Sequence, residues 1–175
     1  MSISSKNGDE GFTSLKSGEQ VSKDDLRVNA YGNLDELAVL VSDALHYQAQ
    51  AEIKPVLIQT RELLFRMIRE LAAADGSYTN KITDSDAKTV TGIVQLYETR
   101  FKLSGLVVPG STPASAKLDY CRVVCRRAER SIVALHSRDR VPVDILALIN
   151  RLSDLFYILA RFDEFKENKI EYKKR

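Results

Sequence analysis

The chain has 175 residues, 44% of them hydrophobic, and a formal net charge of +2. This size supports one domain with a sizeable core, and so mild a charge gives no indication of nucleic-acid binding. No run approaches the roughly 18 apolar residues of a transmembrane helix, and the first residues lack the apolar segment of a secretory signal. We therefore expect a cytoplasmic protein without a membrane-spanning segment.

The spacing of apolar residues predicts the elements in chain order. Residues 1–25 are polar and glycine-rich and show neither helical nor strand periodicity. Helical spacing then predicts five helices, over 27–49, 53–74, 83–102, 114–136 and 142–167. The tail over 168–175 is basic, and we expect it to be solvated. The prediction is a single all-α domain over 1–175, in which a helical bundle over 27–167 follows an N-terminal loop.

Residues near the ends of these helices support the assignment. Pro55 falls in the first turn of the second helix, where a missing N–H group is harmless. Thr83 and the acidic residues that follow it are candidate caps for the third helix. Pro142 is predicted to lie in the first turn of the fifth helix.

Cys121 and Cys125 are the only two cysteines, and they lie on the apolar stripe of the fourth predicted helix. We interpret them as reduced core residues. A metal-binding pair is the alternative, but no third or fourth ligand of suitable type lies near them in sequence. No metal-ligating residue is therefore predicted.

The fourth predicted helix carries an unusual number of arginines. On a helical wheel Arg122, Arg126, Glu129 and Arg130 share a face that is separate from the apolar stripe, whereas Arg127 points elsewhere. Such a face is commonly only solvated. The alternative is a polyanion site, because guanidinium groups match phosphate oxygens and repel one another unless an anion is present.

The fifth predicted helix has a polar stripe opposite its core-facing side. That stripe consists of Asn150, Asp154, Tyr157 and Arg161, with Leu146 and Ile158 beside it. Aliphatic residues on both sides of a polar stripe favour a helix that packs twice, once in its own bundle and once against another chain. We therefore expect an oligomer.

The N-terminal stretch "SSKNGDEGFTS" combines two glycines with a lysine and several hydroxyl groups. It is not a Walker A sequence, and it lacks the strand that a dinucleotide fingerprint requires. Glycines still allow backbone N–H groups to approach an anion, and Lys6, Thr13, Ser14 and Lys23 can add donors.

Four blocks in order resemble the PduO-type ATP:cob(I)alamin adenosyltransferases. "SSKNGDEGFTS" is similar to the family's T-K-x-G-D-x-G-x-T/S, and "SKDDLRVNAYGNLDEL" to its K-D-D-x-R-V-x-A-Y-G-x-x-D-E-L. "VVPGSTPASAKLDYCRVVCRRAERSIV" is similar to P-G-G-x-x-A-S-A-x-L-H-x-x-R-x-x-C-R-R-A-E-R. "LINRLSDLFYILAR" is similar to L-N-R-L-S-D-x-L-F-x-x-A-R, so that the resemblance spans nearly the whole chain.

The resemblance implies a five-helix bundle that assembles as a trimer and binds ATP between subunits. It implies transfer of the 5′-deoxyadenosyl group of ATP to the cobalt of a reduced corrinoid such as cobalamin, with release of triphosphate and with Mg²⁺. Arg126 is the residue expected to act in catalysis, and Asp35 and Arg122 match a pair at the subunit interface. The nucleotide-binding residues implied are Ser5, Lys6, Asn7, Gly8, Thr13, Ser14, Lys23, Arg126, Arg127, Ala128, Glu129, Arg130 and Asn150. A reductase or an adenosylcobalamin-dependent enzyme is an expected partner.

The chain departs from the family pattern at several positions. Leu106 stands where the family commonly has a phenylalanine that closes the lower face of the corrinoid, and Asp119 stands where it has a histidine. Asp119 falls one turn before Arg122 and is placed to pair with it. Ser111, Ala38 and Ser5 are further departures. A non-catalytic relative that carries or senses ATP or an adenosylated corrinoid is therefore the alternative function, and a helical scaffold with solvated charges is the third.

Overall fold

The computed structural model describes residues 4, 6, 8–73 and 76–174, and these form five helices and one short hairpin. The helices are α1 (Leu26–Tyr47), α2 (Ile53–Ala72), α3 (Asp84–Glu98), α4 (Pro113–Asp139) and α5 (Val143–Lys166). The strands are β1 (Phe12–Ser14) and β2 (Gln20–Ser22). The predicted helical bundle is confirmed, with helix ends that differ from the predicted ones by a few residues.

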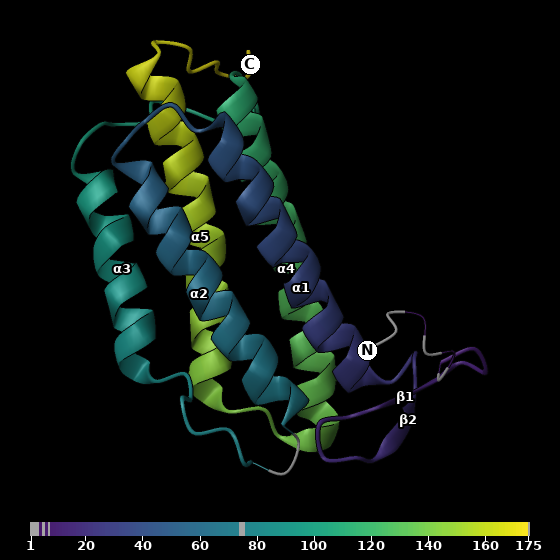
Figure 1. Ribbon diagram of the computed structural model, residues 1–175. Coiled ribbons are helices and arrows are strands. Elements are labelled where there is room, and N and C mark those ends of the chain that lie inside the picture. Colours follow the sequence, from purple (N-terminus) through teal and green to yellow (C-terminus); the bar gives the residue numbers. More distant parts are fainter. Residues whose placement is uncertain (1–3, 5, 7, 74–75, 175) are drawn as a thin grey trace.

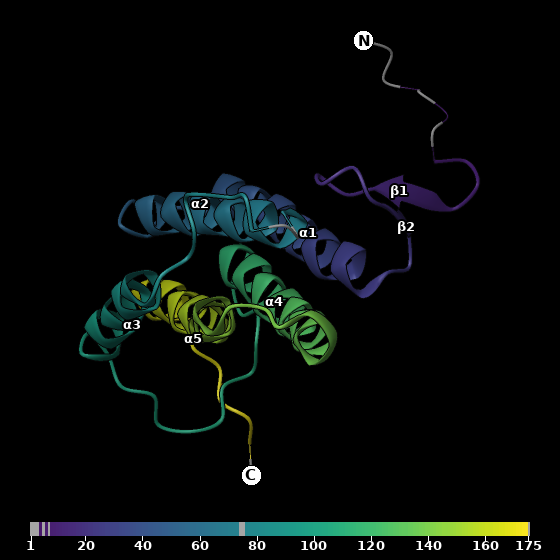
Figure 2. The same ribbon diagram turned by 90° about the horizontal axis from the view of Figure 1, so that it is seen from below.

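The helices form two layers. α1 and α2 lie in one layer, and α3, α5 and α4 lie in the other, with α5 between its two neighbours (Figure 2). α4 packs against both α1 and α5, so it joins the layers. Because α3 of the same chain packs on α5, Ile158 is buried and Leu146 is half-buried against the core. These two residues therefore pack at least partly within their own chain, and the expected oligomer stays a prediction.

Local sequence explains where the helices begin. Thr83 and Asp86 form a capping box at α3, as the sequence predicted. Thr112 caps α4 in the same way, and Pro113 takes its first position, where the fixed φ of proline suits a helix. Pro142 precedes α5 as its N-cap residue and does not lie in its first turn.

The N-terminal segment contains a hairpin that the sequence did not predict. β1 and β2 pair antiparallel, with Thr13 opposite Val21. Strands of three residues are too short to give a visible alternation of apolar and polar residues, which explains the miss. Gly11 and Gly18 have φ values of +84° and +87°, a region that residues with a Cβ atom rarely enter. The hairpin stands beside the beginning of α1, apart from the bundle (Figure 1).

An ion-pair network joins the beginning of α1, just after the hairpin, to the end of α4. Arg138, near the end of α4, donates to both carboxylate oxygens of Asp25, at 2.7 and 3.1 Å. Arg27 Nη2 donates to Asp139 Oδ2 at 2.8 Å, and Asp139 also accepts a hydrogen bond from Arg138. These hydrogen bonds from Arg138 lower the pKa of Asp25 below its usual value.

The C-terminal tail is held against the loop between α3 and α4. The Val108 N–H donates to the Glu171 carbonyl at 2.8 Å, and the Lys173 N–H donates to the Leu106 carbonyl at 2.8 Å. The tail meets this loop in both ribbon views (Figures 1 and 2). The tail side chains are mostly exposed, as expected for a solvated segment, and the tail backbone in addition pairs with the loop.

Both cysteines are free and buried, which confirms their assignment to the core. Burial raises the pKa of the Cys121 thiol to about 12, so this side chain stays protonated at neutral pH. Within the described ranges, no helix combines the length and the apolar character that crossing a bilayer would need.

Candidate functional site

The arginine face of α4, which consists of Arg122, Arg126, Glu129 and Arg130, forms as the helical wheel predicted. Arg126 and Arg130 are exposed, and neither makes an ion pair with another described residue. They lie one turn apart, so each raises the positive potential at the other. Two guanidinium groups at this spacing, without a carboxylate partner among the described residues, form a surface that suits an anion.

Glu129 lies between these arginines and meets α5. The Asn150 Nδ2 atom donates to Glu129 Oε1 at 3.0 Å, which brings together two residues that the resemblance placed in one site. Asn150 Oδ1 accepts in turn from Arg151 on the same helix. The contact leaves a carboxylate and an amide beside the cationic pair, groups that suit sugar hydroxyls.

A groove of about 760 Å³ runs beside this face, between α3 and α4 and over α5. Its polar lining includes Arg122, Arg126, Arg151, Asp154 and Tyr157. Its apolar lining is supplied by Val94, Phe101, Leu103 and Ile158. The groove therefore offers a charged wall and an apolar wall to one ligand. The sequence analysis did not single out Arg151, although it directly follows Asn150 in "LINRLSDLFYILAR".

Two residues of the predicted nucleotide site lie away from this face. Arg127 points toward α1, where it donates to Asn33 at 3.2 Å and pairs with Glu36. Ala128 is completely buried in the core, so its methyl group is not available to a nucleotide. The helical wheel had placed Ala128 on the apolar stripe, and its burial agrees with that position. Nucleotide contacts of Arg127 and of the Ala128 backbone stay predictions.

The N-terminal loop has its own cation. Lys23 Nζ donates to the Gly8 carbonyl at 2.6 Å, which folds the loop back on the end of the hairpin. A Cβ atom at Gly8 would lie 2.8 Å from Lys23 Nζ, so glycine permits this close approach. Lys6 has a φ of 61°, which lies in the left-handed region that residues with a Cβ atom rarely adopt. Ser5 and Asn7 of the predicted site lie outside the described residues.

Thr13 and Ser14 occupy successive positions on β1 and so point to opposite sides of the hairpin. Only one of them can face a given ligand unless that ligand wraps the strand. Thr13 is half-buried and Ser14 is exposed.

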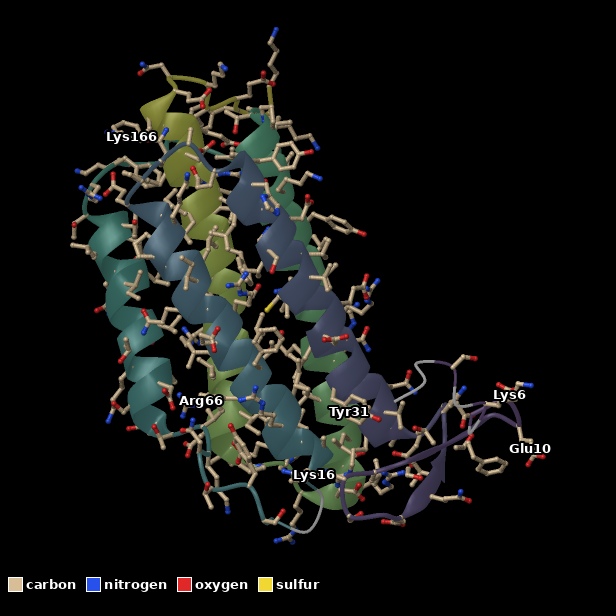
Figure 3. The ribbon with its side chains drawn as sticks, viewed as in Figure 1. Lys6, Glu10, Lys16, Tyr31, Arg66 and Lys166 are labelled. Atoms are coloured by element: carbon tan, nitrogen blue, oxygen red, sulfur yellow. The ribbon has the colours of Figure 1, made fainter. Side chains whose placement is uncertain are left out.

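The loop and the arginine face do not meet within one chain. Lys6 and Glu10 lie at the outer edge of the loop, directed away from the bundle (Figure 3). Among the residues that the structure describes, no hydrogen bond or ion pair joins the loop to Arg122, Arg126 or Arg130. The predicted nucleotide residues therefore form two separate groups in a single chain.

Asp35 is exposed on α1, and Arg122 does not pair with it within the chain. Arg122 Nε donates instead to Asp119 Oδ1 at 3.0 Å, which confirms the proximity expected from their spacing. Arg161 was predicted on an outer polar stripe, but it is fully buried, with Asp119 and Glu164 as partners. This prediction was wrong because α4 covers that end of α5.

Leu106, the predicted corrinoid-facing residue, is 70% exposed in the loop between α3 and α4. Its neighbour Val107 is buried and forms an isolated β-bridge with Tyr172 of the tail. Phe101 is also buried and stacks on Phe165, with ring centroids 5.3 Å apart. Leu106 is therefore the most exposed apolar side chain of this part of the loop, followed by Val108.

Comparisons with known proteins agree with this geometry. The family described as cobalamin adenosyltransferase matches residues 3–163. A corrinoid adenosyltransferase of Citrobacter freundii is 32% identical over 93% of this chain and 94% of its own length. The corrinoid adenosyltransferase PduO of Salmonella typhimurium is 33% identical over 94% of this chain, which spans 50% of that longer protein.

The similarity to a solved structure also covers nearly the whole chain. A variant of the PduO-type ATP:corrinoid adenosyltransferase from Lactobacillus reuteri, solved with cobalamin and ATP, superposes with a TM-score of 0.91 at 28% identity. The match covers 99% of this chain and 100% of that one. The chain belongs to the cobalamin adenosyltransferase family.

Proposed function

We propose that this protein transfers the 5′-deoxyadenosyl group of ATP to the cobalt of a reduced corrinoid and releases triphosphate. The observation that carries the proposal is the unpaired cationic face of α4, with Arg126 and Arg130, beside the Glu129–Asn150 contact. A polyphosphate and a ribose are the ligand groups that such a surface fits.

The reaction needs placement and charge stabilisation more than proton transfer. Cobalt(I) supplies the electron pair for the new Co–C5′ bond, and the C5′–O bond breaks as triphosphate leaves with its electrons. No proton moves in this step, so no general base is required. Neither histidine lines the groove. Guanidinium groups that face the leaving triphosphate lower the barrier because they meet charge as it develops.

Within this scheme Arg126 and Arg130 bind the triphosphate, and Glu129 and Asn150 bind the ribose. Mg²⁺ would be held by triphosphate oxygens and water, since the described residues contain no cluster of three or more potential metal ligands. The ion would neutralise part of the charge on the leaving group.

A trimer completes the nucleotide site in this proposal. The loop group, with Lys6, Gly8, Thr13 and Lys23, and the arginine face stand apart in one chain, and the loop projects away from the bundle (Figure 3). The loop of one subunit would then close over the arginine face of the next, with Asp35 and Arg122 paired across the interface. The support is the separation of the two groups and the absence of an Asp35 partner in the described part of the chain.

The corrinoid is placed in the groove and against Leu106. The apolar wall suits the flank of a macrocycle, and the exposed leucine suits its lower face. Transfer of the adenosyl group then occurs where the groove meets the arginine face, since Arg126 belongs to both.

The test is an anaerobic assay with ATP, Mg²⁺ and chemically reduced cobalamin, followed by the visible spectrum. We expect the spectrum of an alkylated corrinoid to replace that of cobalt(I), with one triphosphate released per turnover. Binding of ATP without product would favour the carrier or sensor function. The departures from the family pattern at Leu106 and Asp119 are the observations that motivate this alternative. A protein that binds no ATP would refute both.

A further inference from the structure

A buried ion cluster lies at the end of the bundle next to the groove. Arg161 on α5 has 0% of its side chain exposed, and its Nη2 atom donates to Asp119 Oδ2 and, at 2.9 Å, to Glu164 Oε1. Glu164 is equally inaccessible. The guanidinium carbon also lies 5.3 Å from the centre of the Tyr157 ring. One arginine therefore contacts groups on both α4 and α5.

The Asp119 side of the cluster leads to the arginine face. Asp119 uses Oδ2 for Arg161 and Oδ1 for Arg122 Nε, at 3.0 Å. Arg122 lines the groove, as does Tyr157. A carboxylate that is held at one oxygen by a buried arginine has a fixed direction at the other, so Asp119 restricts the orientation of Arg122.

The Glu164 side leads to the loop that presents Leu106. Glu164 Oε1 accepts from the Ser111 backbone N–H at 3.1 Å. Next to it, Thr112 Oγ1 donates to Asp163 Oδ2 at 2.6 Å. The end of the loop is thus tied to α5 by two buried carboxylates.

Stability alone does not explain these charges. Burying an ion pair requires removing both ions from water, and apolar replacements of similar volume are often as stable. The cluster is also incomplete, because Arg161 Nε and Nη1 and Glu164 Oε2 have no hydrogen-bond partner in the described part of the chain. What the cluster does supply is a rigid connection between two parts of the site.

We propose that Arg161 is a positioning residue, which orients Arg122 through Asp119 and holds the Leu106 loop through Glu164, so that the arginine face and the corrinoid-facing loop keep a fixed relation. The inference rests on the proposed function. It adds a role for a residue that touches neither ATP nor the corrinoid.

The experiment measures steady-state kinetics in the cobalt assay for Arg161→Met, with Arg66→Met as the matched control. Arg66 makes a two-bonded pair with Asp86 between α2 and α3, at 2.7 and 3.0 Å, and lies outside the groove. We expect Arg161→Met to lower kcat on the order of tenfold to a hundredfold, the loss typical when an orienting group is removed. The KM for ATP should rise by a smaller factor than kcat falls, because Arg126, Arg130 and the Glu129–Asn150 contact are not disturbed.

A double-mutant cycle keeps the proposal testable if Arg161→Met does not fold. Asp119→Asn should lower kcat in the native chain but have little further effect in an Arg122→Ala chain, because its action on turnover passes through Arg122. If Asp119→Asn lowered kcat by the same factor in the native chain and in the Arg122→Ala chain, the proposal would be overturned. It would also be overturned if Arg161→Met had the same kinetics as Arg66→Met. An inactive native protein would instead refute the proposed function itself.

Discussion

Replacing Arg126 by alanine tests the central assignment of the site. Arg126 is exposed, makes no ion pair within the described residues and lines the groove. Its removal therefore takes away a cation from the site without opening a cavity in the core. The free energy of unfolding should change by no more than about 0.5 kcal/mol, the usual range for such surface substitutions.

The effect on turnover should be much larger. Loss of one donor to developing negative charge raises a barrier by about 2–4 kcal/mol. At about 1.4 kcal/mol for each factor of ten, kcat should fall roughly 30-fold to 1,000-fold. Arg126→Lys keeps the charge but loses the planar fork, so it should recover only part of this loss.

The assay is formation of the Co–C bond from ATP and reduced cobalamin, with thermal unfolding measured on the same preparations. Arg69→Ala is the matched control, because Arg69 is also an exposed helix arginine without an ion pair in the described chain, and it lies on α2 away from the groove. We expect the control to retain native turnover. If Arg126→Ala turned over like the control, the arginine face would not be the triphosphate site.

Three further predictions concern assembly, pH and the tail. Asp35→Lys should weaken ATP binding and shift sedimentation toward monomer, since it places a cation opposite Arg122; a native trimer with native ATP affinity would contradict the composite site. Arg138 lowers the pKa of Asp25, so this pair stabilises the fold above about pH 4 and loses that contribution as the pH falls further. Arg138→Met should therefore flatten the loss of melting temperature below pH 4. Deleting the chain from Asn168 onward removes the backbone pairing with the Leu106 loop and should raise the KM for corrinoid more than that for ATP, as initial rates would show.

The helices could be predicted because each buries a stripe of apolar residues at a period near 3.6. Leu118, Cys121 and Ile132 repeat at that period, and all three are fully buried. The same wheel separated Arg126 from the core and showed that Arg127 points elsewhere. It also placed Ala128 in the core, where this residue is fully buried, because burial follows directly from the position of a side chain on its helix.

The features that could not be predicted depend on contacts between distant residues. The Arg161–Asp119 pair joins positions 42 apart, and no local pattern indicates that α4 would cover that end of α5. The tail pairs with a loop more than sixty residues earlier in the chain, through backbone groups that every residue carries. A charged residue on a wheel is usually assigned to solvent, so a buried arginine is the kind of residue that this reasoning misplaces.

Leu106 offers a test of how the corrinoid site is closed. If a broad apolar side chain here keeps the lower ligand off the cobalt, Leu106→Phe should increase the four-coordinate fraction of cobalt(II) corrinoid bound with ATP. Leu106 is 70% exposed, so the larger ring should fit without overpacking the core. Its extra apolar contact with the corrinoid is worth roughly 1–2 kcal/mol, which corresponds to about a tenfold change in the ratio of four- to five-coordinate complex.

The measurement is the spectrum of cobalt(II) corrinoid with ATP, compared between the native chain and the variant. Val143→Phe is the matched control, because Val143 is 71% exposed at the opposite end of the bundle, where α5 begins (Figure 1). Phe101 and Val107 are already buried, so neither is free to act as the wedge in place of Leu106. A strong four-coordinate signal in the native chain that decreases in Leu106→Phe would refute the reasoning. It would mean that leucine at this position already closes the site and that a ring displaces the corrinoid.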